Sequence, residues 1–294
     1  MAGRRHFTDI AYAEEFVMAT VMPERGALAA ADRFHELHRA GCFVMPNPWD
    51  AGSARVLEQL GFRALATTSS GHAWSLGRAD NHVLLEQALA HFRALAAAVT
   101  VPVNGDFEGG FAVEPAEVGA HVELAVRTGI AGVSIEDSTG DARNPLFEFE
   151  LAVERVRAAR RAIDESRTRV VLTGRSEGFI AGRPDLAETI RRLQAYADAG
   201  ADCLYAPGIK SREDITAIVR AVAPKPVNVL VGGDFTTLYR LAELGVRRIS
   251  VGGALARAAW TGFLAAAEEI AQQGTFTKLA RAIPFDAING RFTR

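Results

Sequence analysis

The chain has 294 residues, 49 % of them hydrophobic and 23 % charged, which suits a globular protein with one large domain or two smaller ones. Its net charge of −2 and lack of a basic stripe argue against nucleic-acid binding, and no apolar run approaches the ~20 residues that cross a bilayer. The two cysteines, Cys42 and Cys203, are too few for a disulfide framework and indicate buried, reduced thiols, so we expect a cytoplasmic protein.

Residues 1–24 show no regular hydrophobic pattern, and we interpret them as an N-terminal extension ahead of a single domain over residues 25–294. From there, short runs rich in Val, Ile and Leu alternate with helical periodicity, as in parallel sheets covered by helices. The expected strands are 42–46, 64–68, 101–106, 132–136, 169–173, 203–206, 227–231 and 248–251. The expected helices are 25–40, 51–60, 83–98, 115–128, 149–166, 184–199, 211–222, 235–244 and 254–273.

Helix boundary signals support this division of the chain. Pro115 and Pro184 lie in expected first helical turns, and a glycine follows four of the expected helices. Eight β/α units predict a (β/α)8 TIM barrel with an extra N-terminal helix and a C-terminal helical tail. A doubly wound open sheet is the alternative, but no Gly-x-Gly-x-x-Gly turn follows the first expected strand.

Acidic residues end two neighbouring expected strands, where a barrel keeps its chemistry. Asn104, Asp106 and Glu108 alternate, so an extended strand would present all three on one face. Glu136 ends the next strand and shares a face with Ser134. Hard divalent cations take such oxygen ligands, and we therefore predict a magnesium site; helix capping and turn formation are the structural alternative.

Other strand ends carry possible ligand-binding groups. Thr67–Ser70 offer four hydroxyl groups for an anion such as a carboxylate, or form an ordinary polar loop. Arg175 can clamp a carboxylate or pair with nearby acids. Trp49 can line the site or pack on a helix that Asp50 caps. The pairs Gly232-Gly233 and Gly252-Gly253 suit a phosphate, or simply short turns.

Taken in order, several phrases resemble those of the phosphoenolpyruvate mutase/isocitrate lyase superfamily over roughly residues 25–265. The phrases are Pro46-Asn-Pro-Trp-Asp-Ala-Gly-Ser-Ala-Arg55, Thr67-Thr-Ser-Ser-Gly, Leu76-Gly77 with Asp80, Asp106-Phe-Glu-Gly-Gly, Ile135-Glu-Asp137, Gly174-Arg175 and Ala199-Gly-Ala-Asp-Cys-Leu-Tyr-Ala-Pro207. Each phrase alone is a weak motif, but their order and spacing are specific.

The resemblance implies a magnesium-dependent barrel, with Mn²⁺ as a possible substitute, acting on a small carboxylic acid. It implies that Asp106 and Glu136 hold the metal, with Asp80 nearby. Thr68, Ser69, Ser70 and Arg175 would bind the substrate, a 2-oxo acid or its enolate. From their places in the sequence we add Glu108 as a further metal ligand and Trp49 as a further substrate-binding residue. It also implies a homodimer or homotetramer in which the C-terminal helix packs on a neighbouring subunit.

Two departures from the superfamily pattern affect the expected chemistry. Asn104 stands where an aspartate is usual, and Ser138–Phe147 lacks the Lys-Cys-Gly-His lid of the carbon–carbon lyases. Asn144 lies near the place of the mutases' lid asparagine, so the candidate catalytic residues are Arg175, Thr68 and Asn144.

We expect a lyase or decarboxylase that cleaves or forms a C–C bond next to the carbonyl of a small 2-oxo or 2-hydroxy acid, through an enolate. A phosphonomutase or phosphonopyruvate hydrolase acting on a P–C bond is the first alternative. A non-catalytic 2-oxo-acid-binding barrel and a metal-independent phosphate-binding barrel are the others. No nucleic acid or membrane partner is expected.

Overall fold

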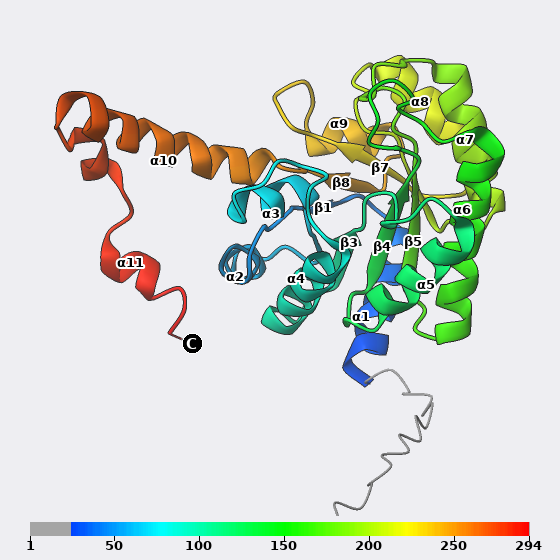
Figure 1. Cartoon of the computed structure of the whole chain (residues 1–294), viewed down its shortest axis with the longest axis horizontal. Helices are drawn as coiled ribbons and strands as arrows, with labels where there is room; N and C mark the ends of the chain where they lie inside the picture. The colour runs from blue at the N-terminus through cyan, green and yellow to red at the C-terminus, as the bar shows by residue number, and fades with distance from the viewer. Residues whose placement is uncertain (1–24, 294) are drawn as a thin grey trace, which may run out of the picture.

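The computed structural model describes residues 25–293, so the expected extension over residues 1–24 lies outside the described residues. Eight parallel strands form a nearly closed barrel surrounded by helices, which confirms the predicted TIM barrel (Figure 1). The strands are β1 (Phe43–Met45), β2 (Leu65–Ala66), β3 (Val103–Asp106), β4 (Gly132–Glu136), β5 (Val171–Arg175), β6 (Cys203–Tyr205), β7 (Val227–Leu230) and β8 (Arg248–Ser250). The helices are α1 (Arg25–Arg39), α2 (Ala51–Gln59), α3 (Ser69–Ser75), α4 (Leu85–Ala98), α5 (Pro115–Val126), α6 (Phe149–Ser166), α7 (Leu186–Asp198), α8 (Arg212–Ala221), α9 (Leu238–Glu243), α10 (Ala254–Gln273), η1 (Thr277–Arg281) and α11 (Phe285–Asn289).

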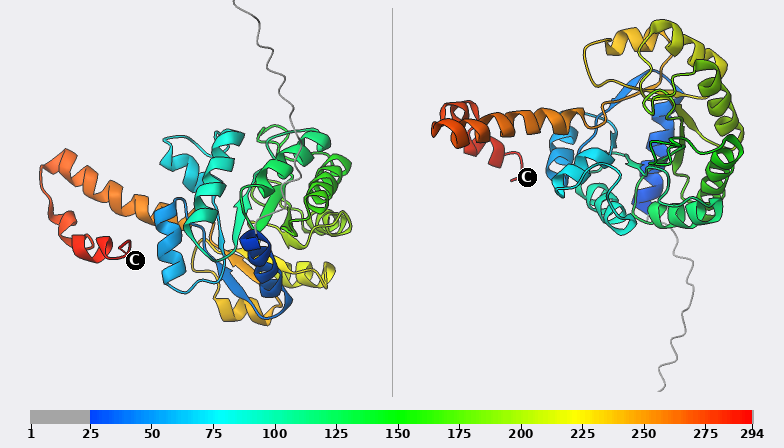
Figure 2. Two further views of the ribbon diagram at one scale, coloured as in Figure 1. Left: turned by 90° about the horizontal axis from the view of Figure 1, so that it is seen from below. Right: turned by 45° about the horizontal axis from the view of Figure 1, so that its top comes forward.

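The strands follow the order β1-β8-β7-β6-β5-β4-β3-β2. The seam between β1 and β2 is joined by two hydrogen bonds beyond the strand ends. The Ala66 N–H donates to the Pro46 carbonyl at 3.1 Å, and the Asn47 amide donates to the Thr67 carbonyl at 2.8 Å. The right-hand view of Figure 2 shows the resulting ring of helices around the strands.

Alternation along each strand separates two environments. On β4, Val133 and Ile135 point outward into the core shared with the helices, whereas Ser134 and Glu136 point into the barrel. The predicted shared face of Ser134 and Glu136 follows directly from this period of two. The inward-facing side chains therefore define the site, and the outward-facing ones hold the fold together.

Helix α1 seals the N-terminal end of the barrel with apolar side chains. Phe34 is fully buried in a cluster with Phe43, Ala64 and Val171. Gly132 allows this packing, because a Cβ atom there would lie 2.6 Å from the Phe34 ring. The seal leaves only the opposite end of the barrel open to a ligand.

All nine expected helices are present, and Asp50 caps α2 as predicted by accepting from the Ser53 N–H at 2.6 Å. Helices α3, η1 and α11 were not predicted, because seven or fewer residues are too short for a clear hydrophobic period.

Neither cysteine is in a disulfide, and Cys203 is buried while Cys42 is partly exposed. In residues 25–293 no helix is both long and apolar enough to span a membrane.

His38 joins the α1 seal to the barrel and should make stability depend on pH. Its Nδ1 lies 2.7 Å from the Phe34 carbonyl, and burial, with the nearby Arg248 charge, lowers its pKa to about 3. The unfolded chain therefore binds a proton more readily than the native state as pH falls below about 6.5. Between pH 7 and pH 5 we expect His38 to remove about 2 kcal/mol of stability.

Urea unfolding of wild type and His38→Gln at both pH values measures this contribution. The variant should lose less stability on acidification than the wild type, and the exposed control His82→Gln should behave as the wild type does. Parallel curves for wild type and His38→Gln would refute the assignment.

Candidate active site

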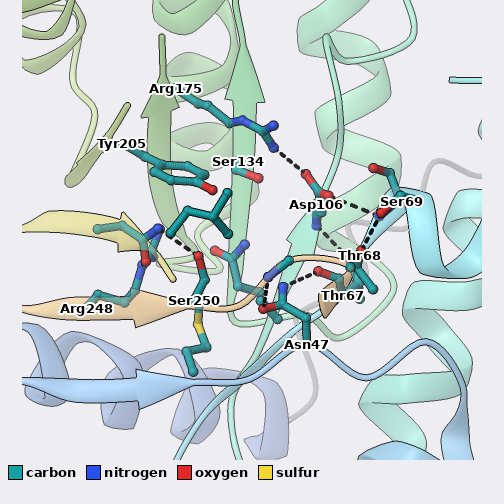
Figure 3. A pocket seen from close by; sticks show the side chains of 18 of the residues that line it. Asn47, Thr67, Thr68, Ser69, Asp106, Ser134, Arg175, Tyr205, Arg248 and Ser250 are labelled. Atoms are coloured by element: carbon teal, nitrogen blue, oxygen red, sulfur yellow. Dashed lines mark hydrogen bonds and ion pairs between the residues drawn. The ribbon is translucent and has the colours of Figure 1, made fainter. Parts of the chain in front are cut away.

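The C-terminal ends of the strands surround a cavity of about 170 Å³, here called the main cavity (Figure 3). It is lined by Met45, Asn47, Ala66, Thr67, Thr68, Ser69, Ser70, Asp80, Asn104, Asp106, Ser134, Arg175, Tyr205, Asn228, Leu230, Arg248, Ser250, Gly252 and Gly253. The cavity is smaller than the ~300–1,000 Å³ typical of sites for drug-sized ligands, so it suits a ligand of few heavy atoms.

Arg175, at the end of β5, contacts three carboxylates, of which only Asp106 also lines this cavity. Its Nη1 lies 3.2 Å from Asp106 Oδ1 and 3.2 Å from Glu136 Oε2, and its Nε donates to Glu177. Arg175 therefore pairs with nearby acids, one of the two roles expected for it, and its side chain also lines the main cavity. One guanidinium facing three carboxylates leaves an excess of negative charge.

The surroundings of these acids oppose their ionisation. Burial raises the pKa of Glu136 well above its ordinary value, against the attraction of Arg175, and the neighbouring carboxylates raise it further. Burial and then Asp106 raise the pKa of Asp80, which lines the same cavity. Such a cluster is stabilised by a bound proton or cation.

The donor atoms fit a magnesium ion. Asp106 and Asn104 lie on the same face of β3, and the buried Asn104 Oδ1 has no hydrogen-bond partner among the described residues. Asp80 adds a second carboxylate to the cavity lining, close enough to Asp106 for that charge to raise the pKa of Asp80. In residues 25–293 no three His, Cys, Asp or Glu side chains converge as a complete metal cage. Mg²⁺ commonly uses only one or two carboxylates and completes its shell with water and substrate oxygens.

Asp106 is itself fixed by main-chain and side-chain contacts. Its Oδ2 accepts from the Ser69 N–H at 3.0 Å, and its own N–H donates to Thr67 Oγ1 at 2.8 Å. These contacts tie the end of β3 to the segment after β2, so the predicted acid and the predicted hydroxyl groups meet at one place.

Glu108 does not continue the alternation of β3, contrary to the expectation from an extended strand. The strand ends at Asp106, and the Gly110 N–H donates to the Phe107 carbonyl, which closes a turn. Within this turn Glu108 has a φ of 47°. Glu108 instead lines a smaller side cavity beside His72 and His91. Burial and the nearby Asp106 raise the pKa of Glu108 to about 8.

His72 also faces this side cavity. Its ring stacks on His91 at a centroid distance of 3.8 Å, and burial lowers the pKa of both histidines. The structure does not bring His72 to the main cavity.

The predicted hydroxyl groups lie at the start of helix α3 and not in an irregular loop. Thr68 caps the helix, since its Oγ1 accepts from the Gly71 N–H at 3.3 Å, and Thr68, Ser69 and Ser70 all line the main cavity. Trp49 supports this helix from behind: a Cβ on Gly71 would lie 3.1 Å from Trp49 Cβ. Trp49 is not among the residues that line the main cavity.

Asn144 lies in the exposed part of the segment between β4 and α6, outside both cavities. Ser138 and Leu146 form an antiparallel bridge, and the Thr139 N–H donates to the Pro145 carbonyl at 3.0 Å, so the segment folds on itself. Asn144 reaches the main cavity only if this segment rearranges.

Asp137 faces away from the cavity, although it follows Glu136 directly. Its Oδ1 accepts from the Glu177 N–H at 2.7 Å and its Oδ2 from the Tyr196 hydroxyl at 2.6 Å. Asp137 therefore holds in place the segment that carries the Arg175 partner Glu177.

The glycine pairs are poorly arranged for a phosphate. Gly252 and Gly253 line the main cavity, but the N–H groups of Val251 and Gly252 both donate to Asn47 Oδ1 at 2.9 Å. Gly232 and Gly233 lie outside the cavity lining. The N–H groups of Val251 and Gly252 already have Asn47 as a partner, which disfavours the phosphate-binding alternative.

The sequence analysis did not identify the inner wall of the cavity, formed by Tyr205, Asn228, Arg248 and Ser250. A signal for them is present in the sequence: Tyr205 and Asn228 are polar residues on otherwise apolar strands, and Arg248 and Ser250 alternate with apolar residues.

Comparison with known proteins agrees with this geometry. The family profile described as phosphoenolpyruvate phosphomutase matches residues 34–271. An uncharacterized protein of Mycobacterium tuberculosis is 32 % identical over 261 residues, covering 88 % of this chain and 95 % of that protein. The oxaloacetate decarboxylase of Paraburkholderia xenovorans is 33 % identical over 229 residues, covering 72 % of this chain and 71 % of that enzyme.

Among solved structures, a Burkholderia cenocepacia protein described as a lyase or mutase is 47 % identical, with a TM-score of 0.89. The match covers 92 % of this chain and 98 % of the other. Sequence, fold and the grouping of Asp106, Arg175 and Glu136 therefore agree, and this chain belongs to the phosphoenolpyruvate mutase/isocitrate lyase superfamily.

Proposed function

We propose that the protein is a magnesium-dependent enzyme that acts on a small 2-oxo or 2-hydroxy acid and cleaves a C–C bond so that the electron pair is left on the carbon next to a carbonyl, as an enolate. The observation that carries this proposal is the cluster of Asp106, Glu136 and Glu177 around Arg175, beside a row of hydroxyl groups in a small cavity. The oxaloacetate decarboxylases among the relatives favour decarboxylation within this class.

Asp106 and Asp80 would hold the ion directly, and Glu136 and Glu108 would contact its bound water. When bound, magnesium supplies a Lewis acid that stabilises the negative charge developing on the substrate's carbonyl oxygen. The hydroxyls of Thr68, Ser69 and Ser70 orient the substrate carboxylate. Arg175 contributes positive charge beside them, and Glu136 and Glu177 fix its direction.

Decarboxylation fits the residues available on the chain. The bond to the departing carboxylate breaks with its electron pair left on the enolate, so carbon dioxide leaves without needing a proton. The segment Ser138–Phe147 has no cysteine, lysine or histidine to act as an acid toward a larger leaving group. A small cavity with fixed donors also limits the water that reaches the enolate.

Cleavage or transfer at a P–C bond is the second candidate, favoured by the match to the phosphomutase profile. It would require a group at Asn144 to act in the cavity, and Asn144 lies outside it. A non-catalytic 2-oxo-acid-binding role differs from both in giving tight binding with no turnover of oxaloacetate or phosphonopyruvate.

Oxalate, a mimic of the pyruvate enolate, tests the site directly by calorimetric titration. We expect binding with magnesium and at least tenfold weaker binding after chelation, because the cation offsets the excess carboxylate charge. Asp106→Ala should abolish magnesium-dependent binding and the turnover of oxaloacetate, while the exposed control Asp198→Ala retains both. Equal oxalate affinity with and without magnesium, or full activity of Asp106→Ala, would refute the metal site.

The C-terminal arm, residues 254–293, gives a separate expectation for assembly. Figures 1 and 2 show α10 extending away from the barrel. Trp260, Phe263 and Leu264 form an apolar stripe on α10, and the Phe263 side chain is 59 % exposed. Because contiguous exposed apolar surface marks an interaction site, we propose that the arm packs on a second copy of the chain in a homodimer or homotetramer.

Replacing Trp260 and Phe263 together by Glu should reduce the mass in solution to that of one chain, measured by light scattering after size exclusion. Gln272→Glu, an exposed change on the same helix, should leave the oligomer intact. A wild-type protein that is already monomeric at micromolar concentration would contradict the proposal.

A further inference from the structure

The main cavity extends below its mouth to a buried arginine that the proposed chemistry does not use. Arg248 belongs to β8, is 1 % exposed and lines the cavity together with Asn228 and Ser250. In Figure 3, Arg248 and Ser250 lie on the opposite side of the cavity from Asp106 and Ser69. The interior of a TIM barrel is usually filled by branched apolar side chains, so a charged group here is unusual.

Neutral side chains hold the Arg248 guanidinium in place. Its Nε donates to Asn228 Oδ1 at 2.9 Å, and its Nη2 donates to Thr173 Oγ1 at 3.0 Å. Nη1 lies 3.4 Å from His38 Nε2, which is the acceptor when Nδ1 donates to the Phe34 carbonyl. The Asn228 amide in turn donates to Ser250 Oγ at 2.9 Å, so the network is fixed before any ligand arrives.

No carboxylate in the described part of the chain neutralises the positive charge of this group. Arg248 forms no ion pair with any residue in the described part of the chain, whereas Arg175 faces three carboxylates. A guanidinium has five N–H groups, and these three contacts leave two of them for a ligand. Burying an unpaired charge is costly, and an anion from outside the chain would offset that cost.

We propose that Arg248 forms an inner subsite for the distal carboxylate of a dicarboxylic 2-oxo or 2-hydroxy acid. The ligand's other end would lie at the mouth, against Arg175 and the hydroxyls of Thr68 to Ser70. This proposal rests on the proposed function, because it assigns the second end of the same substrate. It makes Arg248 a residue that selects diacids over monoacids of equal length.

A pair of matched ligands isolates the inner subsite. Malate and 2-hydroxybutanoate share the 2-hydroxy-carboxylate end and differ at the far end, where one has a carboxylate and the other a methyl group. With magnesium present, we expect the wild type to bind malate about ten- to a hundredfold more tightly, as for one charge-assisted hydrogen-bonded contact. Equal affinities for the two acids in the wild type would overturn the inner subsite.

Variants then identify the residue responsible. Arg248→Gln should lose the preference for malate while its oxalate affinity stays within about twofold, since oxalate is short enough to need only the mouth. Arg155→Gln removes another arginine that is 1 % exposed but lies outside the cavity lining, and it should keep the preference. A folded Arg248→Gln protein that still prefers malate would refute the assignment.

The oxalate titration separates the two proposals. Oxalate binding to the wild type without any preference for malate rejects the inner subsite and leaves the metal site standing. Failure of the wild type to bind oxalate rejects the proposed function, and the inner subsite with it. If Arg248→Gln does not fold, equal affinities of the wild type for malate and 2-hydroxybutanoate still overturn the inner subsite.

Discussion

The grouping of three carboxylates around the single guanidinium of Arg175 is the interaction on which the site depends. Asp106, Glu136 and Glu177 come from different parts of the chain, and each would be costly to bury without that charge. The guanidinium does not balance them fully. The cluster therefore requires a bound proton or a cation to be stable, and the proposed magnesium ion would serve in the second way.

The inward side chains of the barrel change along its axis, from apolar at the end that α1 closes to polar towards the open end. Helix α1 closes one end with Phe34 and apolar neighbours, while the strands above carry Asn104, Ser134, Asn228 and Ser250. Small polar residues fill less volume than the branched apolar ones usual in such barrels, which leaves room for a ligand inside. Because Asn228 and Ser250 are polar and buried, they need hydrogen-bond partners, and the network that holds Arg248 supplies them.

The proposed chemistry and the proposed oligomer depend on residues in different parts of the chain. Asp106, Glu136 and Arg175 lie on strand ends of the barrel and the hydroxyl groups lie at the start of α3, whereas Ser138–Phe147 and the C-terminal arm lie outside the barrel. Rigid elements position reacting groups more accurately than loops do.

The sequence by itself determined the barrel, because hydrophobic period, Pro115 and the strand–helix alternation are local signals that tertiary packing did not override. It also determined that Asp106 and Arg175 face a common cavity, since strand ends in a barrel must converge. Only the tertiary structure decided the positions of Glu108, Trp49, Asn144 and Arg248. Their positions depend on where a strand stops, on packing between helices or on contacts between residues far apart in the chain, and no local pattern encodes those distances.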